Sequence, residues 1–200
     1  SGELNFVTAP DYETKTSYSA TVTVTDDEDN FSTQNVTINI TNVNDNSPSF
    51  TSNEIYSVEE NQTAIGSVTA NDADGDGITF TISGSEIEVT SEGVLTFTNA
   101  PDYEDKTTYT AIITASDGAN TSTQEITVNI TNVNDESPEF TSNATFSSEE
   151  NQTAIGTVTA TDADGDSVTF TISGSDISIT SSGVLSFVNT PDYETQSAYS

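Results

Sequence analysis

Short acidic groups recur along this chain, and their carboxylate and amide side chains lie close enough in sequence to share a metal ion. The densest group, Asp-Ala-Asp-Gly-Asp at 72–76, returns unchanged at 162–166. Alternate side chains of an extended segment point the same way, so Asp-x-Asp can present two carboxylates to one cation. Calcium takes about six to eight oxygen ligands from carboxylates, amides and backbone carbonyls. These segments therefore indicate oxygen-ligand chemistry with a hard cation.

Three further groups accompany that segment in the middle of the chain. They are Glu-Glu-Asn at 59–61, Asp-Tyr-Glu at 102–104 and Asn-Val-Asn-Asp-Glu at 132–136, and a single Asp117 follows a predicted strand. Zinc fits these groups poorly because it prefers His and Cys, and the chain contains neither. Each group alone could be a polar turn, but their joint occurrence favours calcium.

An EF-hand is excluded by the surroundings of 72–76. Asp72, Asp74 and Asp76 match the opening of an EF-hand loop, but the twelfth position, where that loop needs a bidentate acid, is Ser83. The flanking segments are predicted strands, whereas an EF-hand needs helices.

The charge of the chain excludes several classes of partner. The formal net charge is -31, from 33 acidic residues against two basic ones, Lys15 and Lys106. Nucleic acids and anionic membrane surfaces are excluded, because their phosphates require Lys and Arg. No long apolar run predicts membrane insertion. Paired carboxylates can hydrolyse glycosides, but no His, Arg, Cys or Trp supports a catalytic pocket, so we expect no enzyme activity.

Alternating apolar and polar residues predict the strands that position these groups. Segments 35–41 and 125–131 alternate Val or Ile with polar residues. This pattern is typical of strands with one buried face and argues against a disordered chain. We expect strands near 50–58, 63–70, 78–83, 86–90, 93–97, 107–116 and 123–132. Seven short strands in one repeat predict an all-β Greek-key sandwich.

Matching segments return about every 90 residues, so the chain is expected to contain tandem modules of that length. Residues 1–48 are the C-terminal part of one module, 49–138 are a complete module and 139–200 are the N-terminal part of a third. Pro48 and Pro138 mark the junctions, because Pro cannot continue a strand ladder. The part-modules either belong to a longer array, which we favour, or complement one another between chains.

Together these motifs resemble the cadherin repeat. The order Glu-Asn, Asp-Ala-Asp, Asp-Tyr-Glu, Ala-x-Asp-Gly and Asn-Asp-Asn-x-Pro-x-Phe runs in register through the whole chain. The resemblance implies tandem seven-stranded, cadherin/Ig-like β-sandwiches that bind Ca2+ where consecutive modules meet. The short loop with the added Asp76 and Asp166 is similar to bacterial cadherin-like modules.

The resemblance also implies one ligand set for each junction. The first set is Asp11, Glu13, Asn42, the backbone of Val43, Asn44, Asp45, the backbone of Asn46, Asp72, Asp74 and Asp117. The second set is Glu60, Asp102, Glu104, Asn132, the backbone of Val133, Asn134, Asp135, the backbone of Glu136, Asp162 and Asp164. Asn42 and Asn132 stand where the family usually has Asp, which removes one charge from each junction.

The function implied by the resemblance is mechanical. We expect an extracellular, cell-surface stalk, filament or adhesin segment that calcium stiffens and that mediates cell adhesion. Without a cation the clustered carboxylates repel one another and the joint flexes. The expected partners are calcium, neighbouring modules of the same chain and other copies, as homophilic or filament contacts. The alternatives are a module face that binds carbohydrate or another copy, and an acidic spacer that needs no metal.

Overall fold

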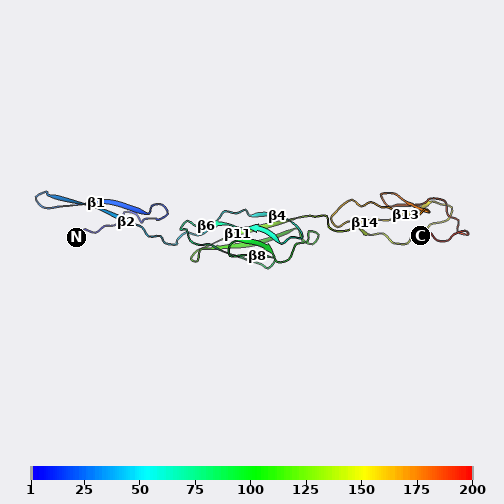
Figure 1. The fold of residues 1–200 in the computed structure, drawn as a ribbon, viewed down its shortest axis with the longest axis horizontal. Helices are drawn as coiled ribbons and strands as arrows, with labels where there is room; N and C mark the ends of the chain where they lie inside the picture. The colour runs from blue at the N-terminus through cyan, green and yellow to red at the C-terminus, as the bar shows by residue number, and fades with distance from the viewer. Residues whose placement is uncertain (1, 200) are drawn as a thin grey trace. The chain divides into compact units, whose positions relative to one another are not determined.

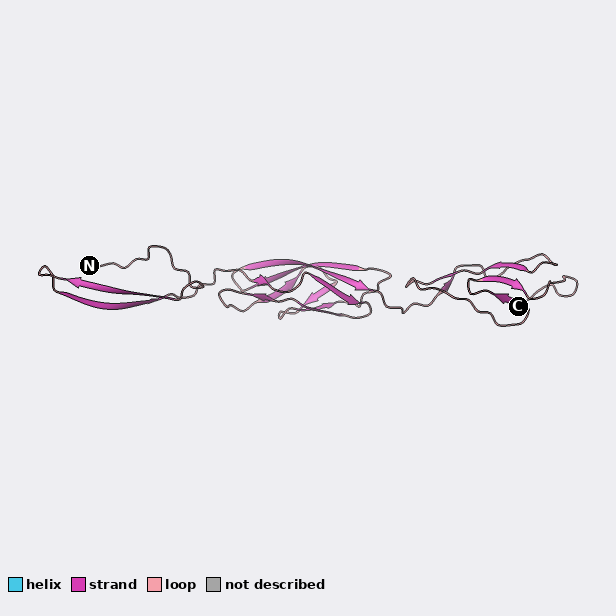
Figure 2. Cartoon of the chain, turned by 90° about the horizontal axis from the view of Figure 1, so that it is seen from above, coloured by secondary structure: helices cyan, strands magenta, loops and turns pink. Residues whose placement is uncertain are grey.

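The structure is a computed structural model that describes residues 2–199. Within these residues every regular element is a β-strand (Figures 1 and 2), so no helix is long and apolar enough to cross a membrane. The chain forms two compact units. Unit 1 comprises Ser1–Pro101 and Thr108–Ile130, and unit 2 comprises Asp102–Thr107 and Thr131–Ser200. The predicted all-β class is confirmed.

Unit 1 begins with a long antiparallel hairpin. Strand β1 (Ser17–Thr25) pairs with β2 (Phe31–Asn39) without a register shift. Both strands are rich in β-branched residues such as Thr and Val, and this composition suits a pleated surface. Lys15 Nζ lies 4.3 Å from the centre of the Tyr18 ring, so one of the two basic side chains packs on an aromatic face at the start of the hairpin.

The larger part of unit 1 is a β-sandwich with the two layers expected from the strand pattern. One sheet has the order β4 (Ile55–Glu59), β11 (Thr121–Thr131), β10 (Thr108–Ser116) and β7 (Thr79–Ile82). The facing sheet has the order β5 (Ala64–Ser67), β9 (Val94–Phe97) and β8 (Ile87–Val89). A short pair, β3 (Ser49–Phe50) with β6 (Ala70–Asn71), completes the set.

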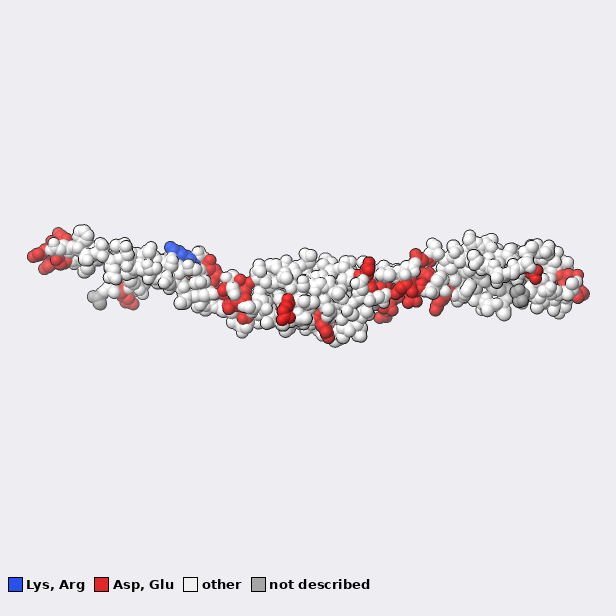
Figure 3. All heavy atoms as spheres, in the orientation of Figure 1, with Lys and Arg blue, Asp and Glu red and all other residues white. Residues whose placement is uncertain are grey.

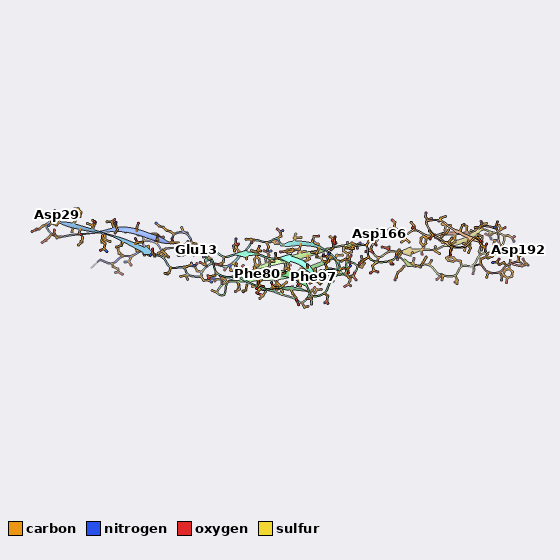
Figure 4. All side chains as sticks on the ribbon, viewed as in Figure 1. Glu13, Asp29, Phe80, Phe97, Asp166 and Asp192 are labelled. Carbon is orange, nitrogen blue, oxygen red and sulfur yellow. The ribbon has the colours of Figure 1, made fainter. Side chains whose placement is uncertain are left out.

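The core of the sandwich comes from alternate residues of these strands, which point inward between the sheets. Ile113, Ala115, Ile126 and Val128 of β10 and β11 are all 0% exposed, as is Val68 between β5 and β6. Phe80 and Phe97, which Figure 4 marks among the strands, are 8% and 3% exposed. Burial of these side chains fixes the register, because a one-residue slip would turn every apolar side chain outward.

Two strands predicted as continuous are each divided in the structure. The segment predicted at 50–58 becomes β3 and β4, and the segment predicted at 63–70 becomes β5 and β6. The first division occurs because β3 pairs with β6 whereas β4 pairs with β11, so the chain crosses from one sheet to the other. The second division has the same cause, because β5 pairs with β9 whereas β6 pairs with β3. The register also shifts within β5, between Ala64 and Gly66, and the Tyr56 hydroxyl donates a 2.9 Å hydrogen bond to the Ser67 carbonyl beside this bulge. Alternation alone does not signal either change.

One glycine is required by the packing between the layers. Gly93 has φ +91°, and a Cβ at this position would overlap the backbone carbonyl oxygen of Val68. Its own carbonyl accepts a 2.8 Å hydrogen bond from the Val68 N–H. Gly183 meets the Val158 carbonyl in the same way in unit 2, so this close approach belongs to the repeat itself.

Unit 2 repeats the first strands of the sandwich. Strand β12 (Glu139–Phe140) pairs with β14 (Ala160–Thr161). A three-stranded sheet has the order β13 (Ala154–Thr157), β16 (Val184–Phe187) and β15 (Ile177–Ile179). The bulge between Ala154 and Gly156 reproduces the one in β5. Homologous sequence therefore gives homologous local geometry in both units.

Candidate metal centre

Four connecting segments meet in unit 1 and carry the first predicted ligand set. They are the turn before β1, the linker between β2 and β3, the loop after β6, and the β10–β11 turn. Figure 3 shows red acidic atoms gathered at the end of the sandwich next to the hairpin, whereas the strand faces are mostly white, and Figure 4 marks Glu13 in this region. Strands end here because Asx residues favour turns over ladders.

Asp74 is the central residue of this region. Its Oδ2 accepts hydrogen bonds from the backbone N–H groups of Asp45 (3.1 Å) and Asn46 (2.8 Å). Its Oδ1 accepts from the Asn46 side chain at 3.1 Å, and its backbone carbonyl accepts from Asn42 Nδ2 at 2.8 Å. Loss of hydration raises the pKa of Asp74, but the hydrogen bonds from Asn46 and Asp45 outweigh it, so the pKa is lowered overall. Asp74 therefore holds the linker against the loop as an ionised group.

Three carboxylates from three segments converge beside Asp74. One oxygen each from Glu13, Asp45 and Asp74 lies within 4.8 Å of the others. For Glu13, a hydrogen bond to its own backbone lowers the pKa, but loss of hydration and the neighbouring Asp11 and Asp74 carboxyls raise it further, so the pKa lies above its ordinary value of 4.5. Like charges held this close favour either a shared proton or a bound cation.

The fit to calcium is tested by Asp72, which lies in the same loop. Its Oδ1 caps the turn by accepting from the Asp74 and Asp76 N–H groups at 3.0 and 3.4 Å. Its Oδ2 is buried and has no hydrogen-bond partner among the described residues. A buried acceptor without a partner is destabilising, and an oxygen-seeking cation would satisfy it. Asp72, Asp74 and Asp76 also bring one oxygen each within 4.8 Å, so the donor set fits a hard cation.

The remaining residues of the first set take different positions. Asp11 caps its own turn, accepting from the Glu13 and Thr14 N–H groups at 3.0 and 3.3 Å, and lies outside the converging carboxylate groups. Val43 has a side chain that is 63% exposed, consistent with a role for its backbone only. Asn44 and Asp117 are bridged by the Asn120 side chain, whose Nδ2 donates a hydrogen bond to Asn44 Oδ1 and to Asp117 Oδ2.

Unit 2 reproduces this arrangement around Asp164. The Asp164 Oδ2 accepts from the Asp135 and Glu136 N–H groups at 3.2 and 2.8 Å, and its carbonyl accepts from Asn132 Nδ2 at 3.0 Å. Glu104, Asp135 and Asp164 bring one oxygen each within 4.8 Å of one another. Asp164 Oδ1 is buried and without a hydrogen-bond partner in the described part of the chain; it corresponds to Asp74 Oδ1, which in unit 1 accepts from the Asn46 side chain.

The other members of the second set are placed by turns and strand ends. Asp102 caps its turn, accepting from the Glu104 and Asp105 N–H groups at 2.9 and 3.2 Å. Asp162 accepts from the Asp166 N–H at 3.3 Å, Asn134 donates to Asp166 Oδ2, and Val133 is half-buried. Glu60 follows β4 in unit 1 and is only 2% exposed.

Sequence reasoning missed two features of these regions. Asn120 is absent from both predicted ligand sets, yet its side chain contacts the linker. The recurrence of Asp26 with Asn30 and of Asp117 with Asn120 is the signal that could have found it. Glu150, Asp192 and Glu194 also bring one oxygen each within 4.8 Å. That group repeats the residue types of Glu60, Asp102 and Glu104 one module later.

Lowering the pH should weaken calcium binding at Glu13, Asp45 and Asp74. Because the pKa of Glu13 is raised, its proton stabilises the metal-free fold below that raised pKa, and this contribution disappears as the pH rises through it. The proton must leave before the carboxylate can bind a cation. Calcium affinity should therefore fall by up to about tenfold per pH unit below the raised pKa.

Calcium titrations from neutral to mildly acidic pH check this expectation. Glu13→Gln should flatten the pH dependence of calcium affinity, because the Gln side chain carries no proton that must leave before calcium binds. The matched variant Glu3→Gln, at an exposed position, should leave it unchanged. An identical slope in wild type and Glu13→Gln would contradict the assignment.

Comparisons with known proteins agree with this geometry. A family model described as bacterial Ig domain matches residues 44–131. The chain is 34% identical over 170 residues to Neural-cadherin of Drosophila melanogaster, covering 76% of this chain and 6% of that protein. It is 33% identical over 150 residues to Cadherin EGF LAG seven-pass G-type receptor 1 of Mus musculus, covering 66% of this chain and 5% of that protein. The chain thus spans a small fraction of the length of these relatives.

Solved structures show the same fold at lower sequence identity. The extracellular domain of Protocadherin GammaB4 superposes with a TM-score of 0.75 at 23% identity, covering 94% of this chain and 34% of that chain. Mouse Cadherin-23 EC22-24 superposes with a TM-score of 0.73 at 22% identity, covering 94% of this chain and 68% of that chain. At these identities the similarity to solved structures concerns the fold alone. The similarity in sequence is to the Drosophila and mouse cadherins named above.

Proposed function

Because this chain is built of cadherin-like β-sandwich domains, we propose that it is a calcium-stiffened segment of an extracellular, cell-surface stalk, filament or adhesin. The module boundaries we propose are 1–48, 49–138 and 139–200, with calcium bound at the two junctions. The role is adhesive and mechanical, not enzymatic. Its partners are calcium, neighbouring modules and other copies of the chain.

One observation carries this proposal. In each unit one carboxylate oxygen of the Asp-Ala-Asp loop is buried and has no hydrogen-bond partner among the described residues; these oxygens are Asp72 Oδ2 and Asp164 Oδ1. Carboxylates from the turn before β1 and from the linker lie beside the same loop in unit 1. A chain with two basic residues against 33 acids cannot neutralise such groups with its own side chains. An external cation is the simplest way to satisfy them.

The chain's own residues supply the mechanical coupling. Asp74 and Asp164 hold the linker N–H groups, Glu13 and Asp45 add charge from two further segments, and Asn42 and Asn132 fix the loop carbonyls. Calcium, when bound, would supply the positive charge that offsets the carboxylates. Ligands drawn from separate segments turn binding free energy into ordering of the junction.

The test is small-angle scattering and thermal melting of the full chain in calcium, in magnesium at equal ionic strength, and in chelator. We expect calcium alone to lengthen the particle and raise the melting temperature. One site at a concentration about 100 times its Kd stabilises by roughly 2.7 kcal/mol. Magnesium controls for charge screening, because it demands a smaller octahedral site. Equal particle length and melting temperature in all three conditions would leave an acidic spacer that needs no metal.

A further inference from the structure

The side-chain amide of Asn120 lies where three ligand oxygens of the first junction converge. Asn120 Nδ2 is 2.7 Å from Asn44 Oδ1, 2.9 Å from the Asn46 carbonyl oxygen and 3.3 Å from Asp117 Oδ2. These oxygens come from the linker and from the β10–β11 turn. Three oxygens from separate segments around one point form the environment of a hard cation, yet here an uncharged donor occupies it.

The hydrogen bonds settle the orientation of this amide. An Asn side chain offers two N–H donors on nitrogen and only acceptors on oxygen. With the amide turned over, Asn120 Oδ1 would face three acceptor oxygens, so the nitrogen must point toward the linker. Two donors serve three acceptors, and the longest contact, to Asp117, is the weakest of the three.

The local turn holds Asn120 in this position independently of the linker. The Asn120 N–H donates to Asp117 Oδ1 at 2.6 Å, and backbone bonding to Asn120 lowers the pKa of Asp117. The hairpin of unit 1 has the same pair, where Asn30 N–H and Nδ2 donate to Asp26 at 2.8 and 3.0 Å. An Asp–Asn pair at this turn is therefore a feature of the repeat, and Asn120 is pre-positioned before it meets the linker.

We propose that the Asn120 amide takes the place of one cation at the junction of unit 1. It ties Asn44 and Asn46 to Asp117 without a metal, and the junction binds one calcium ion fewer than it would without this amide. This inference rests on the proposed calcium function. It makes Asn120 the residue that sets the number of ions at the junction and keeps part of the linker ordered in their absence.

The experiment compares Asn120→Ala and Asn120→Asp with wild type in the full chain. Calcium stoichiometry is measured by titration calorimetry, and amide hydrogen exchange of residues 44–46 is followed in chelator. Both variants should bind one additional calcium ion per chain. In chelator, exchange at 44–46 should be about tenfold faster in Asn120→Ala, which corresponds to roughly 1.4 kcal/mol, and faster still in Asn120→Asp, because a fourth oxygen then faces the other three.

Matched controls separate this effect from a general one. Asn53→Ala and Asn53→Asp make the same changes at an exposed position of unit 1, and both should keep the wild-type ion count and exchange rates. An unchanged ion count in both Asn120 variants, with calcium still bound to wild type, overturns this inference alone. Absence of calcium binding in wild type and in every variant overturns the proposed function as well.

Discussion

Asp74→Asn should lower the calcium affinity of the junction in unit 1 on the order of 100-fold. The two carboxylate oxygens of Asp74 accept three N–H donors from Asp45 and Asn46. An amide would turn one acceptor into a donor that faces other donors, and each hydrogen bond to a charged group contributes about 1.5–3 kcal/mol. Loss of charge and loss of linker docking therefore act together, and a 100-fold change is roughly 2.7 kcal/mol.

Calcium titration calorimetry of the full chain measures this change. The control is Asp27→Asn, which removes the same charge at the exposed tip of the β1–β2 hairpin and should leave the affinity within about twofold. Equal losses in the two variants would mean that overall charge, not the position of Asp74, governs binding.

Glu60→Ala should lower the free energy of unfolding of the sandwich by about 3–5 kcal/mol in calcium and by clearly less in chelator. Glu60 is the one buried charged residue in the described part of the chain, with 2% of its surface exposed. In calcium, removal of its carboxylate leaves buried positive charge without a partner. In chelator, the same removal also relieves the destabilisation of a buried carboxylate, so the net loss is smaller.

Urea unfolding in the two conditions provides the measurement. The adjacent Glu59 is exposed, and its side chain accepts a 3.2 Å hydrogen bond from Gln62 Nε2. Glu59→Ala is therefore the matched control and should change stability by less than about 1 kcal/mol. An equal loss for Glu60→Ala with and without calcium would show that Glu60 acts through packing and not as a ligand.

Much of the fold followed from local pattern. The alternation at 125–131 correctly predicts a strand with Ile126, Val128 and Ile130 inward, and all three are buried. The divisions between β3 and β4 and between β5 and β6 did not follow, because they depend on which sheet each half joins. Pairing of that kind is a long-range property, and period-two alternation looks the same on either sheet.

The ligand chemistry proposed for the candidate site could also be predicted from the sequence, but the geometry of the site could not. Oxygen-rich groups without His or Cys, in a chain of net charge -31, indicate a hard cation whatever the fold, because ligand preference is a property of the residue types. Which oxygens converge depends on how four loops meet. The structure brings Glu13, Asp45 and Asp74 together and uses Asp11 as a turn cap.

The repeat and the strand class were therefore predictable from the amino-acid sequence alone, and the residue types led us to propose a hard cation, since composition and periodicity act locally and do not depend on distant partners. Tertiary packing was needed to show that Asp72 and Asp164 each keep one buried oxygen without a partner among residues 2–199. It was also needed to show that Asn120 contacts linker residues 76 and 74 positions earlier in the chain. Burial and contact across such separations arise only when the sheets pack and carry the turns at their ends into one place.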